Sequence, residues 1–215
     1  MEVIPVINCH DHDIKCVKDK LYHAGKFLQK GDWLHLDISD GRFTFNKSWR
    51  DPQQWAYLRP EFNLEVHLMV EEPEKYLSDW SAAGAGRFIV HKESLSEAAA
   101  ESFVKRARTM RKETVLSSVP HTTTAQLWPY LRFFSHYQVL AVEPGPAGQK
   151  FLPTVLQKIK FLRNFAPNAK IEVDGGITPE IAKLVKKAGA DRIVSSAYIF
   201  GSKNPKSAYK KLQKA

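Results

Sequence analysis

The chain has 215 residues with a formal net charge of +9, and 43% of its residues are hydrophobic. No stretch approaches the roughly 18 apolar residues of a membrane span, and the N-terminus lacks a signal-peptide pattern, so we expect a soluble, cytoplasmic protein with no membrane partner. The positive charge raises the possibility of nucleic acid, but no RNP-like strand, zinc finger or Arg-rich arm accompanies it. We therefore expect no nucleic-acid partner and assign the charge a modest role in attracting anionic substrates.

Short β-branched or aromatic segments alternate with segments of helical periodicity along the chain. The predicted strands are residues 3–8, 33–39, 64–70, 87–93, 114–119, 137–143, 170–176 and 192–200. Amphipathic segments at residues 14–30, 74–84, 98–113, 154–165 and 180–190 predict helices between them, whereas residues 51–62 predict at most a short helix.

This alternation decides the fold class. Strands that alternate with helices pair in parallel through right-handed crossovers. Eight such strands in a chain of this length favour a single (β/α)8 TIM barrel over an open doubly wound sheet. Helix-start signals at Ser96 and at Thr178-Pro179, and a stop signal at Gly189, support the boundaries. With no linker or composition break, we expect residues 1–215 to form one domain.

The cysteines, Cys9 and Cys16, are too few for a disulfide framework and do not form a CxxC zinc knuckle. We expect both to be reduced and to act as small, inert hydrophobic residues, as is usual in the cytoplasm.

Polar side chains interrupt the apolar runs of three predicted strands, near the ends where α/β barrels carry their active sites. His35 and Asp37 are two residues apart and share one strand face, His67 lies in the next strand, and Asp174 ends the seventh. Two imidazoles and two carboxylates suit a divalent ion, with zinc expected first and iron, manganese or cobalt as alternatives. His67 considered alone is better explained as a hydrogen-bonded core histidine.

Glycine-rich or small-residue segments follow the last three strands. Backbone N–H groups in such loops can bind a phosphate dianion. Gly145 considered alone is explained by a tight turn, but three such loops at one end of a barrel predict a phosphate site. The residues expected to contact substrate or phosphate are His67, Gly145, Ala147, Gly148, Gln149, Gly175, Gly176, Ser195 and Ser196.

At these positions the sequence resembles the ribulose-phosphate 3-epimerase family. The matching stretches are HLDISDGRFTFN (35–46), EVHLMVEEPEKYL (65–77), VEPGPAGQKFLPTVLQKIKFLR (142–163), IEVDGGITPEIAKLVKKAGAD (171–191) and SSAYIFG (195–201). The resemblance implies one metal ion held by His35, Asp37, His67 and Asp174. It also implies that Asp37 and Asp174 act as the acid/base pair that inverts C3 of a ketose phosphate.

The sequence departs from the family pattern on the substrate wall and in the phosphate loop. Val6 replaces a serine, Ser39 and Leu140 replace methionines, Pro146 and Ala147 alter a PGFGGQ loop, and Ser195-Ser196 replaces a glycine-serine pair. The metal and acid/base positions are intact, so we expect the departures to affect the substrate and efficiency more than the reaction. The segment 37–40 also lacks the lysine of the DxKxxD arrangement found in related lyases.

The resemblance thus implies an isomerase of carbohydrate metabolism, in the pentose phosphate pathway, that interconverts D-ribulose 5-phosphate and D-xylulose 5-phosphate. The alternatives are an epimerase for a six-carbon ketose phosphate such as allulose 6-phosphate, or a non-catalytic barrel that binds a phosphorylated ligand. We expect a homo-oligomer.

Overall fold

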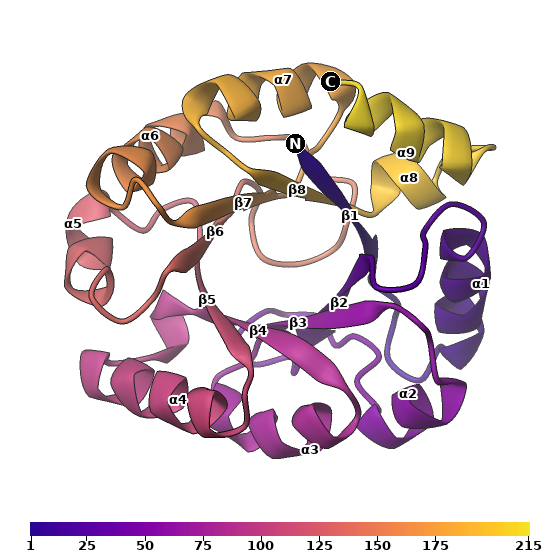
Figure 1. Ribbon diagram of the computed structural model, residues 1–215, viewed down its shortest axis with the longest axis horizontal. Coiled ribbons are helices and arrows are strands. Elements are labelled where there is room, and N and C mark those ends of the chain that lie inside the picture. Colours follow the sequence, from indigo (N-terminus) through magenta and orange to yellow (C-terminus); the bar gives the residue numbers. More distant parts are fainter.

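The computed structural model describes residues 1–215 and shows a closed barrel of parallel strands surrounded by helices (Figure 1). Consecutive strands pair in order, and β1 pairs with β8 to close the ring. The strands are β1 (Glu2–Ile7), β2 (Trp33–Ser39), β3 (Asn63–Met69), β4 (Ala85–His91), β5 (Glu113–Ser118), β6 (His136–Leu140), β7 (Lys170–Asp174) and β8 (Arg192–Ser195). The predicted TIM barrel is confirmed.

The helices follow the strands in chain order and form the outer layer (Figure 1). They are α1 (Ile14–Ala24), α2 (Pro52–Leu58), α3 (Leu77–Ala82), α4 (Glu97–Thr109), α5 (Thr124–Leu127), α6 (Leu156–Phe165), α7 (Pro179–Ala188), α8 (Ala197–Phe200) and α9 (Pro205–Gln213). Short 3-10 turns lie at η1 (Pro73–Lys75), η2 (Lys92–Ser94), η3 (Trp128–Tyr130) and η4 (Pro153–Val155).

Several predicted boundaries need correction. The first helix ends at Ala24 and not at residue 30, and Gly25 is its C-cap. The eighth strand ends at Ser195, and the following residues form the short helix α8. The sixth strand ends at Leu140, before the glycine- and proline-rich loop. Apolar runs cannot distinguish a short strand from a short buried helix, which explains the error at β8.

The predicted helix ends at three positions are confirmed. The Ser96 side chain accepts a hydrogen bond from the backbone of Ala99, and the Thr178 side chain accepts one from Ile181. Gly189 ends α7 in the left-handed conformation that favours glycine, with φ of 113°.

Apolar and polar side chains alternate along β2, so its two faces contribute to two different buried regions. On β2, the fully buried Leu34, Leu36 and Ile38 belong to the apolar core that the strands share with the helices. The intervening His35 and Asp37 are also buried, but their side chains form polar contacts within the barrel. Since successive side chains point to opposite faces, this pattern directs polar groups into the barrel and apolar groups outward.

The cysteine prediction is wrong. Cys9 and Cys16 form a disulfide, with their Cα atoms 5.9 Å apart. Cys9 follows β1 and Cys16 lies in the first turn of α1, so the turn between them brings the two side chains together. The spacing of seven residues between the cysteines did not reveal this disulfide, because the pairing depends on how the chain folds back.

None of the helices has both the length and the apolar character that a membrane span requires.

The turn from β7 to α7 is held at Gly176, which has φ of +66°. A Cβ atom there would overlap the backbone nitrogen of Phe151 and lie 2.6 Å from its Cα. Gly31 also has positive φ, +89°, but open space surrounds it.

We therefore expect Gly176→Ala to destabilise the protein more than Gly31→Ala does. The left-handed conformation should cost each alanine about 1 to 2 kcal/mol, and only Gly176→Ala adds the collision with Phe151. Urea unfolding of both variants measures the difference. Equal losses of stability would contradict the close packing of Gly176, in the turn after β7, against Phe151, in the loop after β6.

Candidate active site

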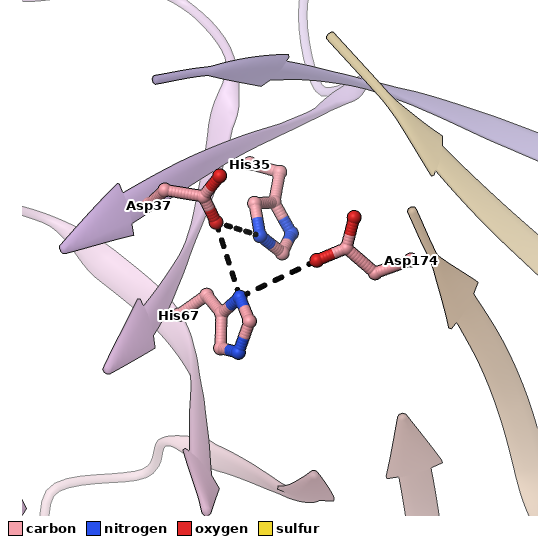
Figure 2. Close-up of side chains that lie close together, drawn as sticks. All are labelled: His35, Asp37, His67 and Asp174. Atoms are coloured by element: carbon pink, nitrogen blue, oxygen red, sulfur yellow. Dashed lines mark hydrogen bonds and ion pairs between the residues drawn. The ribbon is translucent and has the colours of Figure 1, made fainter. Parts of the chain in front are cut away.

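Four side chains from three strands meet near the carboxyl end of the barrel (Figure 2). His35 and Asp37 come from β2, His67 from β3 and Asp174 from β7. The His35 Nε2 and His67 Nδ1 atoms lie 3.1 and 3.0 Å from Asp37 Oδ1. His67 Nδ1 also lies 3.6 Å from Asp174 Oδ2. The structure thus brings together all four residues that the sequence singled out as metal ligands.

The donor atoms fit a divalent ion. One atom from each of the four side chains lies within 4.8 Å of all the others. Two imidazole nitrogens and two carboxylate oxygens form a ligand set that zinc and other borderline ions accept. These four residues could therefore hold a divalent metal ion.

Each histidine has a second polar partner on its other ring nitrogen. His35 Nδ1 lies 2.8 Å from Glu65 Oε1, and His67 Nε2 lies 2.8 Å from His91 Nε2. His91 Nδ1 in turn lies 3.2 Å from Glu93 Oε2. Such outer contacts orient metal-binding histidines and fix which nitrogen carries the proton.

His67 is an uncharged link between Asp37 and His91. Burial lowers the pKa of His67 to about 4, so this ring is neutral near neutral pH. A neutral ring has one N–H and one acceptor nitrogen, so His67 can donate from Nδ1 to Asp37 and accept a hydrogen bond from His91 at Nε2. A metal ion bound at Nδ1 would instead place the ring proton on Nε2, where it can be donated to His91.

The two aspartates have different electrostatic surroundings. Burial pushes the pKa of Asp37 upward, but hydrogen bonds from His35 and His67 outweigh it and hold the pKa well below its usual range. Burial, followed by repulsion from Asp37, raises the pKa of Asp174 to about 7. Two neighbouring carboxylates therefore bind protons very differently, as in many acid/base pairs.

A cavity of about 540 Å³ opens directly above this cluster. Asp37 and Asp174 line it, whereas His35 and His67 are fully buried beneath them. The remaining predicted substrate residues all line the same cavity: Gly145, Ala147, Gly148, Gln149, Gly175, Gly176, Ser195 and Ser196. The three loops predicted to meet at one end of the barrel therefore do so.

The family departures lie in three different surroundings. Val6 and Leu140 line the cavity from β1 and β6, as does Met69 of β3, which keeps the family's methionine. Ser39 does not line the cavity; its hydroxyl accepts a hydrogen bond from the side chain of Asn46, at 3.4 Å. In the loop after β6, the Gln149 side chain donates to the backbone oxygens of Glu143 and Pro146, which ties the loop to itself.

Residues that the sequence reasoning missed include Glu65, Arg87 and His91. Glu65 is two residues before His67 in β3, so it shares the same strand face, and this spacing was the available signal. His91 interrupts the apolar run of β4 in the same way. Arg87 gave no signal, because its partners lie on other strands.

A buried ion pair supports the cluster from below. Glu65 is fully buried and accepts hydrogen bonds from His35 and from Arg87, whose Nη1 lies 2.5 Å from Glu65 Oε2. Arg87 also donates to Glu113 at 2.8 Å, but the Glu113 side chain is 49% exposed.

Glu65→Gln should therefore destabilise the protein far more than Glu113→Gln. Removing one partner of a buried pair costs about 3 to 5 kcal/mol, whereas losing an exposed pair costs about 1 kcal/mol or less. Both variants alter a partner of the same arginine, and Glu65→Gln also changes the partner of His35. Chemical denaturation measures both, and similar losses would mean that the buried pair does not support the cluster.

Comparison with known proteins agrees with these features. Residues 17–200 match the ribulose-phosphate 3 epimerase family. The ribulose-phosphate 3-epimerase of Schizosaccharomyces pombe is 32% identical over 191 residues, covering 85% of this chain and 81% of that protein. The cytoplasmic isoform of this enzyme from Oryza sativa is 33% identical over 197 residues, covering 89% and 86%.

Among solved structures, 3-hexulose-6-phosphate synthase from Salmonella typhimurium has a TM-score of 0.74 at 15% sequence identity, covering 100% of this chain and 97% of that chain. At that identity the likeness concerns the fold alone. The sequence matches go further, because they extend over most of the chain and of its relatives. The chain therefore belongs to the ribulose-phosphate 3-epimerase family and is an isomerase that acts on carbohydrates.

Proposed function

We propose that this barrel, with residues 1–215 as its single domain, interconverts D-ribulose 5-phosphate and D-xylulose 5-phosphate by inverting C3. The observation that carries the proposal is the pair of carboxylates, Asp37 and Asp174, at the floor of a cavity lined by the three predicted phosphate loops. They come from β2 and β7 and point toward one another across the cluster (Figure 2).

Inversion at C3 needs two proton-transfer groups. The hydrogen at C3 is adjacent to the C2 carbonyl, and its removal leaves a planar enediolate. One aspartate takes this proton from one face, and the other aspartate returns a proton to C3 from the opposite face. The substrate need not turn over between the steps, because the two carboxylates approach from different strands.

The four-residue cluster beneath the substrate is the proposed metal site, with His35, Asp37, His67 and Asp174 as ligands. Zinc is our first choice, and iron, manganese or cobalt would suit the same donors. A divalent ion held there would polarise the substrate carbonyl and stabilise the negative charge of the enediolate by several kcal/mol.

The loops after β6, β7 and β8 are the proposed phosphate site. Backbone N–H groups of Gly148, Gly176, Ser195 and Ser196 can donate to a dianion, whereas Pro146 has no N–H to offer. Gly145, Ala147, Gln149 and Gly175 shape the same loops, and His67 supports the substrate from below. The apolar side chains of Val6, Leu140 and Met69, which line the same cavity, would limit the access of water to the reacting carbon.

This activity places the protein in the pentose phosphate pathway. We propose that it acts in the cytoplasm, which the name of the Oryza sativa relative supports, although the Cys9–Cys16 disulfide is unusual in that compartment. We also propose that it is a homo-oligomer, with a phosphorylated sugar as its small-molecule partner. If the altered wall changes the preferred substrate, an assay panel that includes allulose 6-phosphate will show a six-carbon ketose phosphate as the better substrate. Failure with the whole panel would favour a non-catalytic barrel that binds a phosphorylated ligand.

The proposed metal site leads to a prediction about metal content and activity. Equilibrium dialysis followed by metal analysis should find one divalent ion per chain, and chelation should abolish epimerisation until zinc, iron, manganese or cobalt is restored. Asp174→Ala should bind the ion at least about tenfold more weakly, because it removes a charged ligand. Activity that survives complete chelation would rule out metal dependence.

The second prediction concerns proton transfer. Asp37→Asn and Asp174→Asn should each lower kcat by about 10² to 10⁴-fold, because acid/base catalysis contributes that much. Solvent deuterium should enter C3 of both epimers with the native protein, whereas each variant should exchange at most the epimer whose C3 hydrogen faces the remaining aspartate, as NMR of the recovered sugar would show.

The matched control is Asp32→Asn, which changes a carboxylate at the opposite end of β2, away from the cavity. It should exchange deuterium at the native rate. If the native, metal-loaded protein exchanges no deuterium into any ketose phosphate, the epimerase proposal fails.

A further inference from the structure

Lys20 extends from α1 to the rim of the same cavity. Its Nζ atom donates to the backbone oxygen of Asn8 at 2.7 Å and to the Ser196 hydroxyl at 3.1 Å. Asn8 follows β1 and Ser196 follows β8, and both residues line the cavity. Because β1 pairs with β8, the carboxyl ends of the two strands are neighbours. Lys20 lies in α1, the helix that follows β1, and its side chain can therefore reach both ends.

This ammonium group has no counter-ion. Both of its hydrogen-bond acceptors are neutral, and Lys20 forms no ion pair with a carboxylate. The side chain is half-buried, and burial lowers its pKa to about 8, with Asp37 the only carboxylate that opposes this. An ammonium has three N–H donors, and only two are used here. A partly desolvated cation with a spare donor is suited to receive an anion.

We propose that Lys20 binds the substrate phosphate, adding a full positive charge to a site otherwise built from backbone N–H groups. The proposal rests on the proposed function of the same cavity. Ser196 belongs to the predicted phosphate site, so an anion there lies within reach of Nζ. The charge also compensates for Pro146, which leaves the loop after β6 with one backbone donor fewer. The sequence pattern did not reveal this role, since Lys20 is one of many lysines on predicted helices.

Lys158 provides a matched control within the chain. Its Nζ atom also donates to backbone oxygens, of Val119 at 2.6 Å and Pro120 at 3.4 Å, and burial also lowers its pKa to about 8. Lys158 does not touch the residues of the cavity that form the predicted phosphate site. If Lys20 only stabilises the packing of α1 on the barrel, replacing either lysine should have the same effect on phosphate affinity.

The test compares Lys20→Gln with Lys158→Gln, using inorganic phosphate as the probe and calorimetry to measure its Kd. Lys20→Gln should weaken phosphate binding about 10- to 100-fold, the range expected for a hydrogen bond to a charged group. Lys158→Gln should leave it unchanged. With the phosphorylated substrate, Lys20→Gln should raise KM much more than it lowers kcat.

A measurement on the native protein covers the case in which Lys20→Gln does not fold. Inorganic phosphate should slow acetylation of Lys20 and leave acetylation of the exposed Lys160 unaffected, as mass spectrometry would show. Native phosphate affinity in folded Lys20→Gln, or equal weakening in both variants, would overturn the proposal, as would unchanged acetylation of Lys20. Because phosphate binding needs no turnover, a Lys20-dependent Kd without epimerisation would uphold this site while refuting the epimerase proposal.

Discussion

β1 hydrogen-bonds to β8 from Glu2 to Pro5, and this pairing converts the sheet into a closed ring. In an open sheet of the same strand order, β7 would lie far from β2, and Asp174 could not approach Asp37. Closure instead leaves only β1 and β8 between those strands, so the two carboxylates share His67 as a neighbour. The same closure brings Asn8 beside Ser196, where Lys20 joins them. Both the cluster and the anion site therefore depend on one strand pairing.

The features that could be predicted are those encoded within single strands or turns. His35 and Asp37 share a face because they are two residues apart, and the family resemblance joined them to His67 and Asp174. Local signals such as Ser96 and Thr178 also located helix starts correctly. Each of these predictions requires information from only a few consecutive residues or from a recognised motif.

The features that were missed depend on neighbours distant in the sequence. Glu65 is informative only when His35 and Arg87 are placed beside it by β2 and β4. Lys20 resembles every other helical lysine until its contact with Ser196, 176 residues away, is known. The Cys9–Cys16 disulfide is closer in sequence, but it requires a turn whose geometry neither residue encodes. Composition alone could therefore not separate these side chains from ordinary surface or core residues.

The charges inside the barrel give an independent argument about what the cluster accommodates. Four carboxylates lie in its buried polar interior, Asp37, Glu65, Asp174 and Glu172, against the guanidinium of Arg87 and the imidazole of His35, whose pKa is raised. If all six groups are charged, two negative charges remain unbalanced.

Without an ion, the barrel relieves this excess by binding protons. Burial raises the pKa of Glu172 to about 8, with repulsion from Glu65 adding to it, and the pKa of Asp174 rises to about 7. A divalent cation at the four-residue cluster would supply the two missing positive charges and favour the ionised form of Asp174. The raised pKa values of Asp174 and Glu172 and the proposed metal site thus both compensate the same excess of buried negative charge.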